Sequence, residues 1–467
     1  MLFNSLVFLL FSLLVYAAYV AFLPRPRLQN RLLLVASYVF YGYWDWRFLS
    51  LIALSTIVDF IVGISLHRTE ADRRRRYLLA ASVVVNLTVL GFFKYFNFFA
   101  ESLARVADLV GFELSFTTLN IVLPVGISFY TFQSLSYTID VYRRRIPPTT
   151  NLIDFALFVA FFPQLVAGPI ERAGRLLPQI ARPRRIKASQ FDAGVWLILW
   201  GYFKKVVIAD NVAGISDAVF EGYLSSGGLD VVLGVLAFAV QIYCDFSGYS
   251  DIARGLAKLM GFDLVVNFRL PYFADSPSDF WRRWHVSLSS WLRDYLYVSL
   301  GGNRDGQLKT LRNLTLTMLL GGLWHGASWN FVLWGAYHGA LLVVYRLLSS
   351  DGGDRRRSLP AALRILFMFL LTLLGWVFFR ATSLEQIVTM LGSVSFAISS
   401  QTAAVAYRLV FFVVPLAAVQ IWQYTTNDLL IVTKTRGWFR IPAYTFLLVW
   451  IFIFGAREPL EFLYFQF

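Results

Sequence analysis

Long apolar runs separated by short basic segments dominate the chain. Several runs, rich in Leu, Phe, Val and Trp, reach the roughly 18 to 20 residues that a helix needs to cross a bilayer. The strands of a membrane β-barrel would instead alternate apolar and polar residues over about ten positions, and these runs do not. The pattern therefore predicts an all-α polytopic integral membrane protein, with residues 1–467 forming one membrane-embedded domain.

Clusters of Lys and Arg between the apolar runs indicate which loops face the cytoplasm. Because cytoplasmic loops are enriched in these residues, the clusters place the N-terminus outside the cell. The basic clusters lie at 25–31, 67–76, 143–145, 172–187, 304–312, 355–357 and 434–440. We expect about ten or eleven spans, among them 2–23, 32–46, 48–66, 77–99, 119–141, 191–209, 231–243, 361–379, 409–422 and 443–454.

Two apolar segments do not fit simple spans. Residues 152–168 contain Pro163 and end at a Gly-Pro pair, and the loops on both sides are basic, which favours a re-entrant hairpin. Residues 313–348 are interrupted by Gly321–Gly322 and His325–Gly326, so we expect two helices that meet at a turn near His325. Backbone that is not helical at membrane depth must be buried in protein or line a cavity. We therefore expect both segments to help enclose a site inside the protein.

Composition narrows the function classes further. The chain is 58% hydrophobic and 15% charged, which excludes a water-soluble globule. Its net charge of +14 lies in loops between apolar runs, so we expect no nucleic-acid partner. The single cysteine, Cys244, excludes an internal disulfide and a Cys-based zinc site, and we expect no metal. The motifs of serine hydrolases, zincins, NTPases and dinucleotide enzymes are missing.

The four histidines are the first candidates for chemistry. His67 lies in a basic loop and is expected to be solvated, and His338 is expected to pack between helices beside small residues. His325 lies inside an apolar stretch, where an ionisable side chain is by default a functional-site hypothesis. His285 lies on the aromatic face of 281–295, a segment with the spacing of an amphipathic interfacial helix.

A polar run, 243–251, follows a predicted span. Its two carboxylates, Asp245 and Asp251, have three candidate roles: to orient a histidine, to coordinate a cation, or to cap helices. Capping is the commonest of these roles, and we expect it here.

Ordered motifs along nearly the whole chain carry a resemblance to a known family. They are residues 123–133, 162–170, 201–205, 245–251, 280–295, 323–329, 376–380 and 464–467. With these motifs the chain resembles the membrane-bound O-acyltransferases, in the bacterial branch of alginate O-acetyltransferase membrane subunits and, more distantly, teichoic-acid D-alanylation proteins. The resemblance implies a helical body around a central tunnel, in the bacterial cytoplasmic (inner) membrane.

The resemblance also implies roles for individual residues. His325 matches the family's essential histidine and is the expected general base, and His285 matches the second histidine of the bacterial branch. Acetyl-CoA is the expected cytoplasmic donor, with no permanently bound cofactor. The acceptor is then a hydroxyl outside, on a polysaccharide or on a partner protein that completes its acetylation. Arg282, Arg283 and Arg293 are candidates to hold the coenzyme A phosphates, with contact to lipid headgroups as the alternative.

Two other functions stay open from the sequence. One keeps the acyl transfer and changes the cargo to D-alanine, delivered by a carrier protein to teichoic acid. The other is a transporter or flippase for a lipid-linked sugar, which the absence of inverted repeats disfavours.

Overall fold

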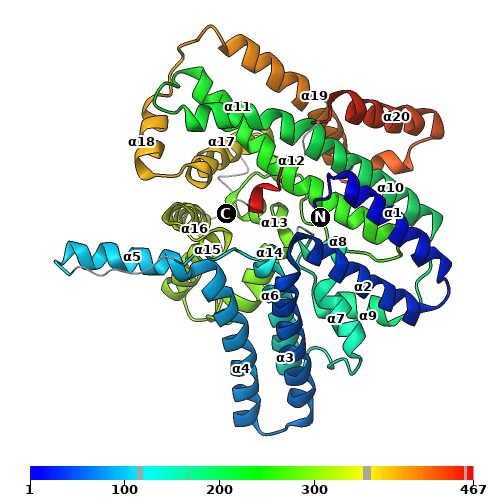
Figure 1. Cartoon of the computed structure of the whole chain (residues 1–467). Coiled ribbons are helices and arrows are strands. Elements are labelled where there is room, and N and C mark those ends of the chain that lie inside the picture. The colour runs from blue at the N-terminus through cyan, green and yellow to red at the C-terminus, as the bar shows by residue number, and fades with distance from the viewer. Residues whose placement is uncertain (113–118, 167, 351–358, 457–459, 466–467) are drawn as a thin grey trace.

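The computed structural model describes residues 1–112, 119–166, 168–350, 359–456 and 460–465, and every regular element in these ranges is a helix (Figure 1). The basic cluster 355–357 and the final two residues of the motif at 464–467 lie outside the described residues. Seven described segments are long and apolar enough to cross a membrane: Pro26–Arg68, Asp72–Leu109, Leu229–Leu259, Trp329–Leu348, Ala361–Arg380, Thr402–Thr426 and Gly437–Phe454. The predicted all-α membrane protein is confirmed, while the total of ten or eleven spans, which also counts shorter helices, stays a prediction.

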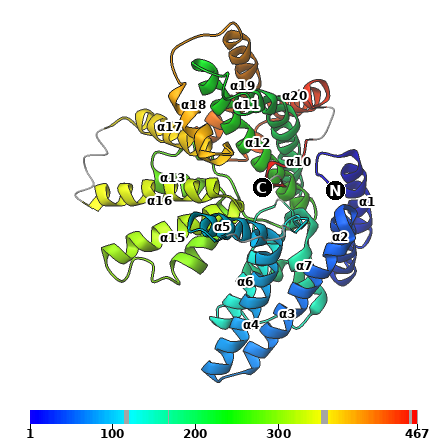
Figure 2. The same cartoon turned by 60° about the vertical axis from the view of Figure 1, so that its left-hand side comes forward.

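The chain forms two successive sets of helices, one before and one after the loop at 182–187. The first comprises α1 (Leu6–Ala21), α2 (Pro26–Asp45), α3 (Leu49–Arg68), α4 (Asp72–Leu90), α5 (Phe96–Leu109), α6 (Ile127–Tyr142), α7 (Leu152–Ala160), α8 (Phe162–Leu165) and α9 (Ala173–Ala181). The second comprises α10 (Ala188–Tyr202), α11 (Asp210–Glu221), α12 (Leu229–Leu259), α13 (Pro277–Arg283), α14 (Val286–Trp291), α15 (Gln307–His325), α16 (Trp329–Ser350), α17 (Ala361–Arg380), α18 (Leu384–Gly392), α19 (Thr402–Thr426) and α20 (Gly437–Phe454). Figure 1 shows α13, α14 and the C-terminal turn Leu463–Phe465 near the middle of the helices, and in Figure 2 this C-terminal turn again lies near the middle.

Three π-helical turns extend helices of the described chain, and the first two also join one helix to the next. These turns are η2 (Gly91–Tyr95), η3 (Phe203–Ala209) and η5 (Leu292–Tyr297). Such turns are rare and occur frequently at functional sites, because the extra residue redirects the side chains of one turn. The first turn carries Lys94, which donates to carbonyl groups of α15, and the second carries the buried Lys204 and Lys205.

The segment before α6 differs from the expected span at 119–141. The helix begins at Ile127, because Gly126 adopts a left-handed conformation with φ of 76° and Pro124 precedes it. The backbone of 119–125 is therefore irregular. This agrees with the rule that such backbone lines a cavity, as shown below.

The polar run 243–251 also differs from its prediction. We expected it to end a span and to cap helices, but α12 continues through it to Leu259. Asp245 lies 2.7 Å from Nζ of Lys205, and Asp251 lies 2.7 Å from Nζ of Lys204. The two carboxylates neutralise two buried lysines. They can therefore lie inside the protein on a continuous helix, because a buried charge is tolerated when it is paired. Asp210, the first residue of α11, also pairs with Lys205, at 2.8 Å.

The predicted pair of helices in 313–348 is confirmed, with one correction. The turn lies between His325 and Trp329, as expected, but Gly321–Gly322 does not interrupt α15. These glycines instead allow close packing against α16, since a Cβ on Gly322 would lie 2.1 Å from the carbonyl oxygen of Phe331. The broken backbone predicted for 152–168 is present too, at Phe161 between α7 and α8.

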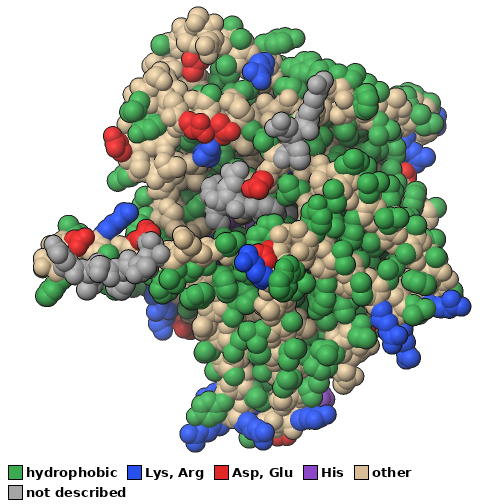
Figure 3. All heavy atoms as spheres, viewed as in Figure 1, with side chains coloured by type: hydrophobic (Ala, Val, Ile, Leu, Met, Phe, Trp, Pro, Cys, Tyr) green, Lys and Arg blue, Asp and Glu red, His purple; other side chains and the backbone are tan. Residues whose placement is uncertain are grey.

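The loops predicted to be cytoplasmic are joined to one another. Arg75 donates to the carbonyl of Tyr142 at 2.6 Å, Arg143 donates to the carbonyl of Asp294 at 3.1 Å, and Arg172 pairs with the carboxylate of Asp294 at 2.7 Å. Figure 3 shows Lys and Arg side chains at the tip of the α3–α4 hairpin and hydrophobic side chains along its flanks. This distribution suits a hairpin whose sides face lipid and whose basic tip faces water at one side of a membrane.

Candidate active site

His325 lies where α15 ends and the chain turns toward α16. It is the last residue of α15, and its side chain is buried, with 3% of its surface exposed. The ring lines a small cavity of about 50 Å³, named here the His325 cavity. Its lining comprises Lys94, residues 123–129, Val166, Trp324, His325 and Tyr464. His325 therefore borders a cavity whose wall includes part of the irregular segment before α6.

His285 lies at a sharp bend, which corrects the prediction of one amphipathic helix over 281–295. The chain forms α13, bends at His285 with φ of 42° and ψ of 55°, and continues as α14. A left-handed conformation is uncommon outside glycine and costs of order 1–3 kcal/mol. Asn267 holds the bend: its carbonyl accepts from the Val286 N–H at 2.9 Å, and its Oδ1 accepts from the Ser287 hydroxyl at 3.0 Å. Helical spacing alone does not reveal such a bend.

The bend brings the two histidines together inside the protein. Their ring centroids lie 6.5 Å apart. Within the described residues, three ring nitrogens lack a hydrogen-bond partner: both nitrogens of His285 and Nδ1 of His325. Aromatic rings surround the pair, with Phe246 4.7 Å from His285 and Trp334 4.9 Å from His325. Unpaired nitrogens in a dry aromatic enclosure remain available to a reacting group.

A second, larger hollow has a volume of about 900 Å³ and several arginines in its lining. We name it the arginine basin. Its lining comprises Arg254, Val266, Arg269, Leu270, Asp279, Arg282, Arg283, Gln423–Thr425 and Asn427–Leu430. Its volume falls within the range of about 300–1,000 Å³ found for ligand sites. Phe268 lies in the same loop as Arg269, and its ring is parallel to that of His285 at 6.5 Å.

The arginines proposed from sequence lie in different surroundings. Arg282 and Arg283 line the arginine basin, and Arg283 pairs with Asp279 at 2.7 Å. Arg293 is not among the basin residues; its exposed side chain pairs with Asp294 at 2.7 Å. Within the described ranges, Arg282 and Arg269 make no ion pair, so their guanidinium groups are free to meet an anion. Arg269 was not predicted, because nothing in its local sequence separates it from other loop arginines.

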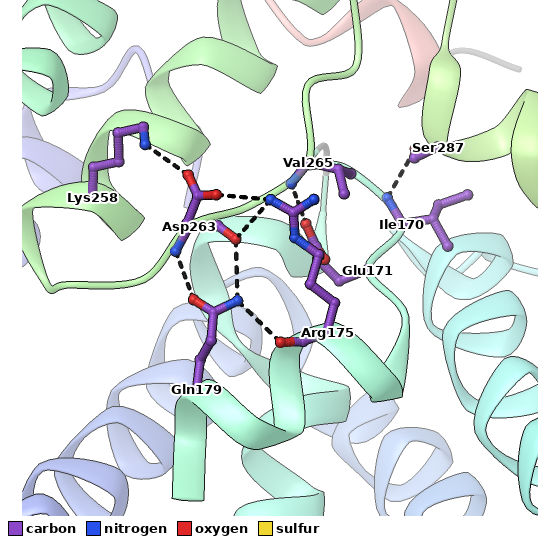
Figure 4. A network of polar contacts seen from close by, with 8 residues as sticks. All are labelled: Ile170, Glu171, Arg175, Gln179, Lys258, Asp263, Val265 and Ser287. Carbon is purple, nitrogen blue, oxygen red and sulfur yellow. Dashed lines mark hydrogen bonds and ion pairs between the residues drawn. The ribbon is translucent and has the colours of Figure 1, made fainter. Parts of the chain in front are cut away.

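A network of polar contacts, buried at Glu171 and Ser287 and exposed at Asp263, fixes the segment that carries His285 to the end of the predicted re-entrant hairpin (Figure 4). Ile170 donates its N–H to the Ser287 hydroxyl at 3.0 Å, two residues from His285. Its neighbour Glu171 accepts from the Val265 N–H, and Arg175 pairs with Asp263 at 2.8 Å. Burial raises the pKa of the Glu171 carboxyl to about 7, against the hydrogen bond from Val265 and the charge of Arg175, which lower it.

Comparisons with known proteins identify the relatives of this chain. A model of the membrane-bound O-acyltransferase family matches residues 143–379. A probable alginate O-acetylase, AlgI, of Azotobacter vinelandii is 47% identical over 389 residues, which cover 82% of this chain and 76% of that protein. A peptidoglycan O-acetyltransferase of Helicobacter pylori is 36% identical, over 79% and 74% of the two chains. A teichoic acid D-alanyltransferase of Streptococcus thermophilus is 31% identical, over 47% and 56%.

The chain belongs to the membrane-bound O-acyltransferase family. It is therefore an acyl-transferring enzyme, and the resemblance noted from the ordered motifs is confirmed. Both candidate histidines and the arginines proposed from sequence lie within the matched residues. The other two histidines of this acyltransferase lie as expected: His67 is exposed at the end of α3, and His338 is buried in α16 with its ring 4.7 Å from Trp334.

Besides Arg269, sequence reasoning missed three residues of this candidate site. Lys94 lines the His325 cavity, Asn267 holds the bend at His285, and Glu171 fixes the neighbouring loop. A lysine within an otherwise apolar predicted span was a usable signal for Lys94, because a buried charge in a membrane is costly. No comparable signal marked Asn267 or Glu171, which lie in polar segments.

Proposed function

We propose that the enzyme moves an acetyl group from cytoplasmic acetyl-CoA to a hydroxyl group outside the bacterial cytoplasmic membrane, for O-acetylation of an extracytoplasmic polysaccharide. The names of the relatives that act on alginate and peptidoglycan support an acetyl cargo and a glycan. One observation carries the proposal: the two histidines lie together inside the protein, and each is close to one of the two hollows. His325 lines one, and His285 is one aromatic layer from the other.

In the proposed reaction His325 is the general base. The oxygen of the acceptor hydroxyl bonds to the thioester carbonyl carbon, its proton passes to the imidazole, and the carbonyl electron pair moves onto oxygen. The tetrahedral intermediate then collapses, the C–S bond breaks, and the coenzyme A thiolate takes the proton from His325. A positioned base contributes roughly 10²–10⁴ in rate.

His285 serves the donor in this scheme. Its ring lies between His325 and Phe268, whose neighbour Arg269 lines the arginine basin. We assign His285 to hold the thioester or to stabilise charge on its carbonyl. The free guanidinium groups of Arg269 and Arg282 are suited to the phosphates of coenzyme A, because arginine binds phosphate oxygens through paired N–H groups. Arg283 contributes charge from its ion pair, and Arg293 is the weakest of the candidates.

The acceptor side favours a slender reacting group. A cavity of about 50 Å³ has room for a few water-sized groups. An acetyl group and one hydroxyl fit this space better than a sugar ring. The final acceptor is the polysaccharide, reached directly or through a partner protein that receives the acetyl group first.

Donor identity tests the proposal most directly. The purified protein in lipid vesicles is supplied either with labelled acetyl-CoA or with a D-alanyl carrier protein, and label is followed into an acceptor inside the vesicle. We expect transfer from acetyl-CoA. Transfer from the carrier protein alone would replace the proposal with D-alanylation, which is supported by relatives that match only about half of the chain. Family membership favours the enzyme over a sugar transporter.

A further inference from the structure

Lys94 is a cation in the cavity that His325 lines. Of the described residues that line this cavity, Lys94 is the only lysine, arginine, aspartate or glutamate. Its Nζ donates to the carbonyl oxygen of Trp324 at 2.7 Å and to that of His325 at 3.2 Å. It also lies 5.8 Å from the centre of the Trp324 ring. A charged side chain at this depth is costly and is a functional-site hypothesis in its own right.

The π-helical turn η2 explains how Lys94 reaches this position. Tyr95, the next residue, donates its hydroxyl to the carbonyl of Leu323 at 3.0 Å. Leu323, Trp324 and His325 are the last residues of α15, whose final carbonyl groups have no partner within the helix. Two adjacent residues of η2 thus bind three consecutive carbonyls, and a cation is favoured at the negative end of a helix.

We propose that the Lys94 ammonium donates a hydrogen bond to the oxyanion formed when the acceptor hydroxyl attacks the thioester beside His325, while it fixes the end of α15. An ammonium has three N–H donors, and two are used by the carbonyl oxygens of Trp324 and His325. The third is left for an atom in the cavity that Lys94 and His325 share. This inference rests on the proposed function of His325 as the base.

The chemistry of the cavity suits this assignment. Negative charge develops on the carbonyl oxygen as the new C–O bond forms, and the site must stabilise that charge in surroundings made of Trp324, Phe129 and Tyr464. A fixed cation in a water-poor site stabilises an oxyanion far better than it would in water. The neutral donors of the surrounding indole rings cannot supply this charge.

A purely structural role is the competing explanation, and Tyr95 provides the matched control. Lys94→Met removes the charge and the hydrogen bonds to two carbonyls. Tyr95→Phe removes one hydrogen bond to the same helix end, and Tyr95 is not among the residues that line the cavity. If Lys94 only fastens α15, both variants will lower thermal stability and activity in parallel.

The experiment measures acetyl transfer by the full-length protein in vesicles, together with its thermal unfolding. We expect Lys94→Met to lower kcat by roughly 10²-fold with an unchanged KM for acetyl-CoA, as for the loss of an oxyanion donor. We expect Tyr95→Phe to lower kcat by less than about fivefold, the worth of one neutral hydrogen bond. Equal losses in the two variants, or a Lys94→Met enzyme with the kcat of the original protein, would overturn the inference.

Two further measurements keep the test decisive. If Lys94→Met does not accumulate in membranes, Lys94→Gln replaces it; it keeps a donor for one carbonyl, loses the charge, and is expected to lower kcat about tenfold or more. His325→Gln is measured in the same preparation. An active His325→Gln enzyme removes the proposed function itself, whereas an inactive one beside an active Lys94→Met enzyme removes only the role of Lys94.

Discussion

The two hollows near the histidine pair, the arginine basin and the His325 cavity, differ in size and in charge. The arginine basin has a volume of about 900 Å³ and is lined by four arginines and two aspartates. The His325 cavity has about 50 Å³ and is lined by one lysine among mostly apolar residues. A large cationic hollow suits a bulky polyanion such as coenzyme A, and a small one with a single cation suits a reacting group. The difference predicts that donor binding and bond making can be altered separately.

The largest effect is expected from His325→Gln, which removes the base and keeps a polar side chain of similar size. The kcat of acetyl transfer should fall roughly 10²–10⁴-fold, while the affinity for acetyl-CoA stays the same, because the arginine basin is untouched. Steady-state kinetics and equilibrium binding measure the two quantities. His338→Gln is the matched control, since His338 is equally buried and does not line the cavity. Similar losses of kcat in both variants would contradict the assigned role.

The second prediction tests the basin. Arg269→Ala and Arg282→Ala should each raise the KM for acetyl-CoA about tenfold and leave kcat nearly unchanged, because a charge-assisted hydrogen bond to phosphate contributes about 1.5–3 kcal/mol. The effect should weaken as salt is added. Arg293→Ala is the control, because this exposed side chain pairs with Asp294 and lies outside the basin lining. A larger change in KM for Arg293→Ala than for the other two would reverse the assignment.

The sequence predicted the elements of this site better than it predicted their geometry. Apolar runs and basic clusters identified the helical membrane body and the turn after α15, because hydrophobic length and loop charge act locally. The bend at His285 was missed, since it depends on Asn267, which lies eighteen residues earlier in the chain. A tertiary hydrogen bond of this kind overrides a helical pattern and leaves no mark in the local sequence.

The buried charges show the same limit. Asp245 and Asp251 were expected to cap helices, whereas they neutralise Lys205 and Lys204 on a neighbouring element. The sequence around these two aspartates indicates that burying their carboxylates is costly, but it does not identify the lysines that pair with them. Lys94 was overlooked for the same reason: its partners are carbonyl groups of α15, which lie 230 and 231 residues later in the chain. Pairing across the fold decides which buried charge is structural and which is available for chemistry.

The third prediction concerns the bend at His285. Asn267→Ala leaves the Ser287 hydroxyl without its acceptor and keeps only the backbone hydrogen bond from Val286 at the left-handed His285, so we expect a loss of about 1–3 kcal/mol in stability and a severalfold fall in kcat. Thermal unfolding and transfer assays measure both. Ser290→Ala, which removes a hydrogen bond from α14 to the Ser287 carbonyl, is the control and should change kcat little. An Asn267→Ala enzyme with normal kcat would show that the bend does not need this anchor.

The smallest effect on kcat is expected at Glu171, where the change is in the pH dependence of stability. Its pKa is raised by burial to about 7 in the folded protein, against 4.5 for an ordinary glutamate, so the folded state retains a proton that the unfolded state has released. Stability from this residue is complete below pH 4.5 and is lost as the pH rises toward 7, with a slope of at most about 1.4 kcal/mol per pH unit. Glu171→Gln should flatten the fall in melting temperature over this range.

Glu70→Gln is the matched control for this pH dependence, because Glu70 is exposed and pairs with Arg144 at 3.3 Å. The Glu171→Gln side chain keeps an oxygen for the Val265 N–H, so this variant should leave the fold of the loop intact. The groups that act on the Glu171 carboxyl, among them Arg175 and Asp263, remain in both variants. An unchanged slope in Glu171→Gln would mean that Glu171 is ionised when buried. The network that fastens the re-entrant hairpin to the bend at His285 would then hold a buried negative charge, stabilised by Arg175 at its edge.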